Sequence, residues 1–214
     1  MIEVIKKGIL FEKTPIEFEN SGVLNPGVIK VGEFVHVFYR AVSFNNFSTI
    51  GYCKLAGPAT IIKRNKTPII VPEFEYESHG VEDPRIVKID ELYYLSYTAY
   101  DGINALGALA VSSDLIHWEK KGIIVPQLTY DEFNLLAPQE NILNENKYIR
   151  YNDQHHLQST TDKEVLLWDK NLLFFPRKLN GKFYFLHRIK PDIQILVGVE
   201  KLEDLTDDFW KNYF

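Results

Sequence analysis

Three copies of one hairpin pattern constrain the fold of this chain more than any other feature. Leu24 to Ser43 and Glu82 to Tyr100 each combine a proline, a short apolar strand, a two-residue turn and an alternating strand. A third copy contains Pro176, the turn Asn180-Gly181 and the strand KFYFLHRI. Asn-Gly between two apolar runs is a strong hairpin signal because both residues tolerate a positive φ. The copies predict a chain built from antiparallel hairpins.

Further strands follow each hairpin. The turns of the first two copies are Gly32-Glu33 and Asp90-Glu91, and the next strands along the chain read STIGYCKL, ALGALAVSS and IQILVGVEKL. With IHWEKKGIIV, the middle copy has four strands in roughly 45 residues, the size of one β-propeller blade. The sequence therefore predicts an all-β propeller with about three blades' worth of repeats. We expect Trp118 to pack in the core or between blades.

The length of 214 residues and the hydrophobic content of 45% suit a single domain over residues 1–214 with a substantial core. Between Pro126 and Leu167 the chain is polar, rich in Asn and Gln, and weakly periodic, which predicts an insertion or an inter-blade loop. His155 and His156 lie in this stretch without a second ligand cluster, so we expect loop histidines and no metal site. The last residues, LEDLTDDFWKNYF, predict a short helix or turn.

Charge and hydropathy exclude several classes of partner. The net charge of -5 and the lack of a Lys/Arg block argue against a nucleic-acid surface. The single cysteine, Cys53, cannot form an internal disulfide and is expected to be an ordinary strand residue. The chain has neither an apolar run of about 18 residues nor the apolar N-terminus of a signal peptide. The sequence predicts a soluble cytoplasmic protein with no membrane partner.

Four motifs, in order, resemble those of glycoside hydrolase family 130. They are LNPGVIK with VHVFYRAV, then GVEDPRI, then YTAYDG with ALAVSSDLIHW, and finally WDKNLLFFPRKLNGKFYFLHR with PDIQI. The resemblance implies a five-bladed β-propeller acting as a β-mannoside phosphorylase, of the mannosylglucose or mannooligosaccharide type, or as a β-mannosidase. Members of that family are usually longer, so this chain resembles their N-terminal portion.

Cleavage of a glycosidic bond requires a proton for the leaving oxygen and a nucleophile on the opposite face of the sugar. An inverting phosphorylase needs one carboxylic acid, because inorganic phosphate is the nucleophile and a basic cluster holds it. The resemblance implies that Asp101, in the Tyr-Asp-Gly motif, is this acid and relays its proton through the mannose 3-hydroxyl. Turn statistics alone favour a capping role for an Asp before Gly. The neighbouring motifs favour catalysis.

The resemblance also implies a mannoside-binding set. Asn25 and Arg40 match positions that contact the mannosyl unit, and Asp83 matches an acidic residue beside it; by themselves, the first two would be a turn residue and a surface cation. The inner strands of a propeller begin near its channel, so Asn25 and Asp83, each before an equivalent proline, should face one pocket. The further candidates for substrate binding are Tyr100, Glu82 and Arg85. Glu82 and Arg85 could instead pair with each other at the rim.

Basic residues of the third copy suggest the phosphate site. The resemblance implies Lys170 and Arg188 as the main phosphate ligands, with His187 a weaker candidate because strand histidines are as often packed as functional. No cofactor or metal is expected, and phosphate acts as co-substrate. The predicted function is inverting phosphorolysis of β-mannosides to mannose 1-phosphate. The alternatives are a β-mannoside hydrolase of the same fold and a truncated, non-catalytic sugar-binding or structural fragment. Exposed blade edges predict a homo-oligomer that covers them.

Overall fold

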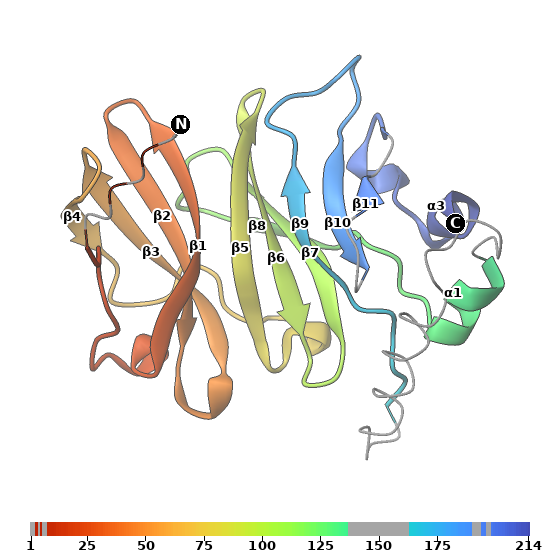
Figure 1. Cartoon of the computed structure of the whole chain (residues 1–214), viewed down its shortest axis with the longest axis horizontal. Helices are drawn as coiled ribbons and strands as arrows, with labels where there is room; N and C mark the ends of the chain where they lie inside the picture. Colours follow the sequence, from red (N-terminus) through yellow and green to blue (C-terminus); the bar gives the residue numbers. More distant parts are fainter. Residues whose placement is uncertain (1–2, 4, 6–7, 137–162, 190–193, 196–197) are drawn as a thin grey trace.

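The computed structural model describes residues 3, 5, 8–136, 163–189, 194–195 and 198–214. In these ranges the chain forms successive antiparallel sheets, which Figure 1 shows side by side. Blade 1 contains β1 (Gly22–Val31), β2 (Phe34–Val42), β3 (Ser48–Ala56) and β4 (Thr60–Arg64). Blade 2 contains β5 (Gly80–Ile89), β6 (Leu92–Tyr100), β7 (Ala105–Ser112) and β8 (Glu119–Ile123). Blade 3 contains β9 (Asp169–Phe174), β10 (Phe185–Ile189) and β11 (Gln194–Ile195).

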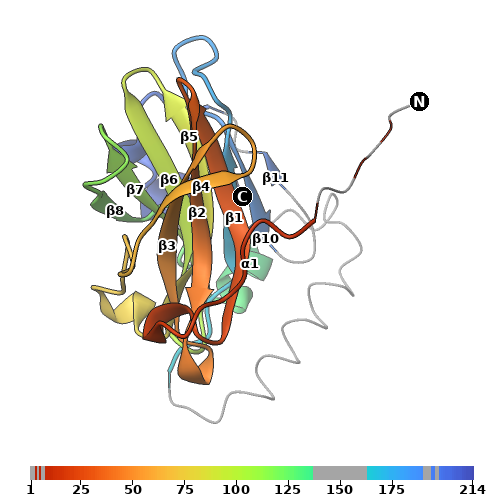
Figure 2. The same cartoon turned by 90° about the vertical axis from the view of Figure 1, so that its left-hand side faces the viewer.

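Each blade is a meander of antiparallel strands, and neighbouring blades are joined by single parallel bridges, Ser48 to Gly80 and Leu106 to Asp169. Figure 2, turned by 90°, shows the blades one behind another. This arrangement confirms the all-β propeller prediction. The helices are short: η1 (Glu17–Glu19), η2 (Phe44–Asn46), η3 (Glu75–Glu77), α1 (Tyr130–Leu136), η4 (Leu202–Asp204) and α3 (Asp207–Tyr213).

The predicted two-residue turns connect the expected hairpins. Gly32-Glu33 joins β1 to β2, and Asp90-Glu91 joins β5 to β6. The Asn180-Gly181 turn lies between bridged Leu179 and Lys182, with φ of 51° at Asn180 and 78° at Gly181. Two successive positive φ angles are the type I′ requirement that favours Asn-Gly.

The first strand of every blade carries a β-bulge at the same place. Asn25 in β1, Asp83 in β5 and Asn171 in β9 have φ of 47°, 51° and 59°, and the pairing register shifts at each of them. Asn and Asp adopt this left-handed conformation more readily than other residues with a side chain. In blade 3, Leu172 follows the bulge where the other copies have proline. Pro176 is therefore not their counterpart, because it lies after β9 in the connection to β10.

The apolar core lies between successive blades. Phe38 and Leu95 are fully buried in the cluster between blades 1 and 2, where Trp118 packs edge-on against Phe38 with ring centroids 5.4 Å apart. Leu109, Phe185 and the helix α3 contribute to the cluster between blades 2 and 3. The Trp118 prediction is confirmed, and burial of these large side chains supplies most of the driving force for docking the blades.

A glycine allows the inner strands of blades 1 and 2 to lie close together. At Gly27, a Cβ atom would lie 2.8 Å from the Pro84 carbonyl oxygen, so only glycine allows β1 to approach β5 this closely.

Cys53 is fully buried in β3, as expected for a strand residue, and burial raises the pKa of its thiol.

A buried tyrosine and glutamate pair fixes the second strand of blade 1 to the helix before it. The Tyr39 hydroxyl donates to Glu19 Oε2 at 2.7 Å, and Arg64 Nη2 of β4 lies 2.9 Å from the same oxygen. Glu19 is fully buried. Burial is the main reason why the pKa of Tyr39 is raised, and the hydrogen bond to Glu19 raises it further.

Blade 2 repeats this arrangement. The Tyr97 hydroxyl donates to Glu77 Oε1 at 2.6 Å, and Lys120 Nζ of β8 lies 2.6 Å from Glu77 Oε2. Glu77 Oε2 also accepts the backbone N–H of Glu73 at 2.8 Å. These side chains are almost completely buried, so their charges must compensate each other within the blade.

The segment before blade 3 returns to the sheets at its end. Residues 137–162 of the predicted insertion, including His155 and His156, lie outside the described residues. Its described parts are residues 126–129, α1 and residues 163–167, and the Leu167 backbone N–H donates to the Leu128 carbonyl at 2.7 Å. The terminal helix α3 confirms the predicted helical end of the sequence. Among the described residues, no helix has the length and apolar character needed to cross a membrane.

Candidate active site

The bulged strand starts and the turns after β2 and β6 lie at one end of the blades, the lower end in Figure 1. There the structure brings two predicted residues together across blades 1 and 2: Asn25 Nδ2 donates to Asp83 Oδ1 at 2.7 Å. Both belong to bulges, and their positive φ angles turn them out of the regular alternation of the strand. A repeated backbone device thus places one polar group of each blade at this end.

Arg40 of β2 reaches across to the bulge of blade 2. Its Nη2 lies 2.7 Å from Glu82 Oε1, its Nη1 lies 3.7 Å from Asp83 Oδ1, and its Nε donates to Ser48 Oγ at 2.8 Å. Burial raises the pKa of the Glu82 carboxyl, and the Arg40 guanidinium offsets part of that effect. Arg40 is therefore an inter-blade ion-pair partner.

The predicted alternative pairing of Glu82 with Arg85 is not what the structure contains. Glu82 pairs with Arg40, whereas Arg85 Nη1 donates to the Pro84 carbonyl at 2.9 Å. The two residues lie on opposite sides of the bulge, since Glu82 precedes it and Arg85 follows it. The structure thus includes Glu82 in the polar cluster and gives Arg85 a backbone contact.

Lys170 and Arg188 form a cross-strand pair in blade 3. Lys170 precedes the Asn171 bulge just as Glu82 precedes the Asp83 bulge, and Arg188 occupies the position of Arg40. Burial lowers the pKa of Lys170; the charges of Glu82 and Asp83 oppose this effect, and that of Arg188 adds to it. Among the described residues, neither Lys170 nor Arg188 forms a salt bridge. Lys170 therefore lies near the carboxylates of blade 2 without a salt bridge to them, and Arg188 lies beside Lys170 on the neighbouring strand.

The structure does not bring the His187 side chain into this cluster. The ring is fully buried, and its Nδ1 lies 2.6 Å from Asp169 Oδ2. The other Asp169 oxygen accepts the backbone N–H of Arg188 at 3.1 Å, and Trp210 packs against the ring at 5.4 Å. His187 and Asp169 replace the tyrosine and glutamate pairs of the first two blades, and they brace the strands that carry Lys170 and Arg188.

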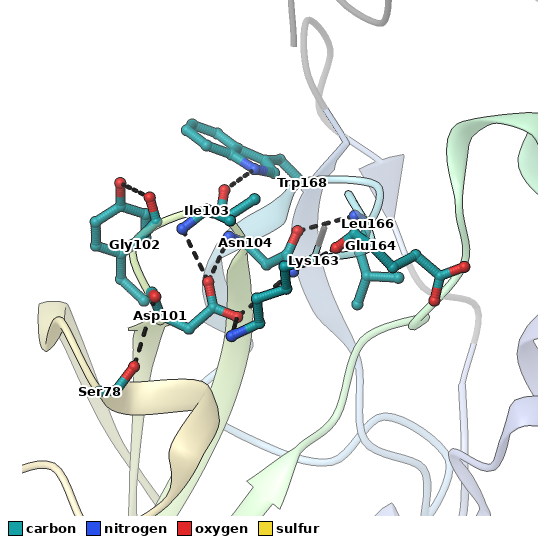
Figure 3. Close-up of polar contacts among 10 residues, drawn as sticks. Ser78, Asp101, Gly102, Ile103, Asn104, Lys163, Glu164, Leu166 and Trp168 are labelled. Atoms are coloured by element: carbon teal, nitrogen blue, oxygen red, sulfur yellow. Dashed lines mark hydrogen bonds and ion pairs between the residues drawn. The ribbon is translucent and has the colours of Figure 1, made fainter. Parts of the chain in front are cut away.

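Asp101 lies in the turn after β6 and is only 8% exposed. Figure 3 shows its carboxylate surrounded by donors: Oδ1 accepts the backbone N–H groups of Ile103 at 2.9 Å and Asn104 at 2.7 Å. Oδ2 lies 2.7 Å from Lys163 Nζ. Burial alone would raise the pKa of Asp101, but the hydrogen bonds from Lys163 and the two amides outweigh burial, and the pKa lies below its ordinary value. Asp101 is thus a turn residue by geometry, and its nearly buried carboxylate is stabilised by protein hydrogen-bond donors.

A cavity of about 360 Å³ opens beside Asp101, and Asn104 and Lys163 also line it. Thr98 is paired with Glu82, and Asp101 follows Thr98 by three residues, so the backbone positions of Glu82 and Asp101 are offset by about 10 Å along the strand. The Tyr100 hydroxyl donates to the Gly102 carbonyl at 2.8 Å, so its proton is used in a hydrogen bond within the turn. Among the described residues, no group of three or more His, Cys, Asp or Glu could hold a metal ion.

Sequence reasoning missed Lys163, Asn104 and Asn171. Aligning the bulges of the three repeats would have found Asn171, because it matches Asn25 and Asp83. No local signal marks Lys163, since only the tertiary fold brings it to Asp101.

Comparisons with known proteins agree with the fold and its motifs. Residues 6–207 match the model of glycoside hydrolase family 130, described as beta-1,4-mannooligosaccharide phosphorylase. A 1,2-beta-oligomannan phosphorylase of Thermoanaerobacter sp. (strain X514) is 30% identical over 201 residues, which is 88% of this chain and 53% of the relative. A beta-1,2-mannobiose phosphorylase of the same organism is 30% identical over 196 residues, 84% of this chain and 51% of the relative. The chain spans about half the length of these curated relatives.

Solved structures show the same fold. A glycosyl hydrolase from Bacteroides ovatus superposes with a TM-score of 0.61 at 21% identity, covering 86% of this chain and 48% of that one. A beta-1,2-mannobiose phosphorylase from Listeria innocua superposes with a TM-score of 0.53 at 18% identity, covering 85% of this chain and 57% of that one. Because the family model matches nearly the whole sequence, the chain belongs to glycoside hydrolase family 130.

Proposed function

We propose that the protein is an inverting β-mannoside phosphorylase, which transfers a mannosyl unit to inorganic phosphate and releases mannose 1-phosphate. The observation that carries the proposal is the Lys170 and Arg188 pair, two cations without a salt-bridge partner in the described part of the chain, beside Glu82 and Asp83. Family membership supports phosphorolysis of β-mannosides. The two relatives at 30% identity are named for β-1,2 linkages, which favours a β-1,2-mannoside substrate.

The polar cluster suits a sugar ring. Asn25, Arg40 and Asp83 bring an amide, a guanidinium and a carboxylate together: the amide donates to Asp83 at 2.7 Å, and the guanidinium lies 3.7 Å from the same oxygen. Sugar hydroxyls both donate and accept, so a set of fixed donors and acceptors can orient one mannosyl unit. In this proposal Glu82 keeps Arg40 in place, and Tyr100 shapes the neighbouring turn.

The reaction requires the transfer of one proton to the leaving oxygen. Asp101 gives that proton through the mannose 3-hydroxyl as the bond from C1 to the leaving oxygen breaks and a bond from C1 to a phosphate oxygen forms. Hydrogen phosphate brings its own proton, which returns to Asp101 after transfer, so substrates and products balance. The position of the phosphate on the face opposite the leaving group inverts the anomeric carbon.

Phosphate fits the basic pair better than water does. Burial lowers the pKa of Lys170, which means that its charge is incompletely solvated. An oxyanion between Lys170 and Arg188 would supply charge-assisted hydrogen bonds to both. A hydrolase would need no such pair at the nucleophile position.

The substitution Lys170→Met is expected to raise the KM for phosphate by about 10- to 100-fold, because it removes a hydrogen bond between charged groups. The KM for the mannoside should change much less. Lys88→Met is the matched control, because Lys88 lies on the inner strand of blade 2 with a half-exposed side chain, and its salt bridge within the described residues is to the exposed Glu91. Initial rates over a phosphate series measure both variants. An equal rise in both KM values would remove Lys170 from the phosphate site.

A product assay tests the function itself. The protein is incubated with β-1,2- and β-1,4-mannobiose, with and without phosphate, and mannose 1-phosphate and free mannose are quantified. We expect mannose 1-phosphate only with phosphate, and faster from the β-1,2 substrate. Free mannose without phosphate would identify a hydrolase, and mannoside binding without turnover would identify a non-catalytic module; either result overturns the proposal.

A further inference from the structure

The last residues before blade 3 form a clamp on the Asp101 turn (Figure 3). Lys163 Nζ lies 2.7 Å from Asp101 Oδ2, and Asn104 Nδ2 donates to the Glu164 carbonyl at 3.0 Å. Asn104 Oδ1 in turn accepts the Leu166 backbone N–H at 2.8 Å. A fourth contact, from Trp168 Nε1 to the Ile103 carbonyl at 2.9 Å, holds the other side of the turn. The clamp holds the residues that follow Lys163 against the turn that carries the Asp101 carboxylate.

Every side-chain and backbone group that contacts the Asp101 carboxylate in the described structure is a donor. The backbone N–H groups of Ile103 and Asn104 serve Oδ1, and Lys163 and the Asn104 amide, at 3.4 Å, serve Oδ2. A carboxylate that accepts several hydrogen bonds is stabilised in its ionised form. A protonated Asp101 would have to turn its hydroxyl away from Lys163, which is the one cation among these donors.

Other titratable groups face the same turn from neighbouring elements. The His79 ring lies against Gly102, and Tyr100 precedes Asp101 in β6. The residues that share the cavity with Asp101 include Glu75, Tyr76 and Glu164. None of these side chains bonds to the Asp101 carboxylate, so Lys163 is the charged side chain in direct contact with it among the described residues.

We propose that Lys163 is a positioning residue that controls the protonation state of Asp101 and thereby the pH range over which the enzyme works in each direction. The proposal rests on the proposed phosphorylase function. In phosphorolysis Asp101 must hold the proton that reaches the leaving oxygen. In the reverse reaction the Asp101 carboxylate takes the proton of the acceptor hydroxyl as that oxygen attacks C1 and phosphate departs. Lys163 favours the second state.

The sign of the effect follows from the contacts. Without Lys163, burial still raises the pKa of Asp101, whereas only the backbone amides and Asn104 remain to lower it. Asp101 therefore stays protonated to higher pH. The high-pH limb of phosphorolysis, where Asp101 loses its proton, moves upward, and so does the low-pH limb of synthesis, where Asp101 gains one.

The test compares Lys163→Met, Lys163→Arg and the surface control Lys121→Met. The ratio kcat/KM is measured against pH for phosphorolysis of β-mannobiose and for synthesis from mannose 1-phosphate and mannose. We expect both limbs to move to higher pH in Lys163→Met, and neither to move in Lys163→Arg or Lys121→Met. Limbs that stay in place in Lys163→Met would overturn the proposal. A purely structural role would lower the rate without moving the limbs.

A second readout does not need turnover. The carboxyl carbon of Asp101 is followed by ¹³C NMR during a pH titration, with its signal assigned by its absence in Asp101→Asn. We expect the titration midpoint to lie at higher pH in Lys163→Met than in the wild type, and an unchanged midpoint would overturn the proposal. If the wild type shows no phosphorolysis, the proposed function fails while this titration still decides whether Lys163 controls Asp101.

Discussion

Asp101→Asn is expected to lower kcat/KM for phosphorolysis by about 10² to 10⁴-fold, the range that a positioned general acid contributes. The amide cannot deliver a proton to the 3-hydroxyl, but its oxygen can still accept the backbone N–H groups of Ile103 and Asn104. The turn should therefore persist, and mannoside binding should change little. Steady-state rates and calorimetric binding of mannobiose measure the two quantities separately.

Asp90→Asn is the matched control for this variant. Asp90 lies in the turn between β5 and β6, at the other end of the same blade, with a φ of 54° that Asn tolerates equally well. We expect its activity to match the wild type. If both variants retain activity, Asp101 is not the proton donor, and if Asp101→Asn also loses mannobiose binding, its effect reflects damage to the site.

Lys120→Met is expected to reduce the free energy of unfolding by about 3–5 kcal/mol, because it leaves Glu77 as a buried charge without its cationic partner. The Lys120 side chain is 5% exposed, and the Glu77 side chain is fully buried. Tyr97 and the backbone still donate to Glu77, but no other cation replaces Lys120 within 4 Å among the described residues. Urea unfolding followed by tryptophan fluorescence measures the loss.

The neighbouring residue provides the control for stability. Lys121 is exposed and pairs with the exposed Glu119, so Lys121→Met should change the free energy of unfolding by less than about 0.5 kcal/mol. Equal effects of the two substitutions would contradict the interpretation of Glu77 as a buried charge that depends on Lys120. The double variant Glu77→Gln with Lys120→Met should recover part of the lost stability, since it removes the unpaired charge.

The hairpins were predictable because their turns carry local signals. Gly32-Glu33, Asp90-Glu91 and Asn180-Gly181 each interrupt an alternating apolar pattern, and each forms the expected turn. The repeat of these hairpins predicted the blades. Proline was a poorer guide, because the feature that recurs is the bulge at Asn25, Asp83 and Asn171, and only two of these residues precede proline.

The site was predictable where equivalent positions of the repeats meet. Asn25 and Asp83 contact each other because their bulges occupy the same place in successive blades. The partner of Glu82 was not predictable in the same way, since Arg40 reaches it from another blade while Arg85 lies nearer in sequence. His187 illustrates the opposite case: its neighbour Arg188 is paired with Lys170, and the strand alternation turns His187 into the core. The contact between Lys163 and Asp101 could not be predicted, because only the tertiary fold brings these two residues together.

In the proposed mechanism, this end of the blades holds a mannosyl unit between a proton-donating Asp101 and a phosphate bound by Lys170 and Arg188. The most direct test is ³¹P NMR of the wild-type protein with β-1,2-mannobiose and inorganic phosphate. We expect loss of the phosphate signal and growth of the signal of α-mannose 1-phosphate, the anomer that inversion produces. An unchanged phosphate signal, with or without release of free mannose, would contradict it.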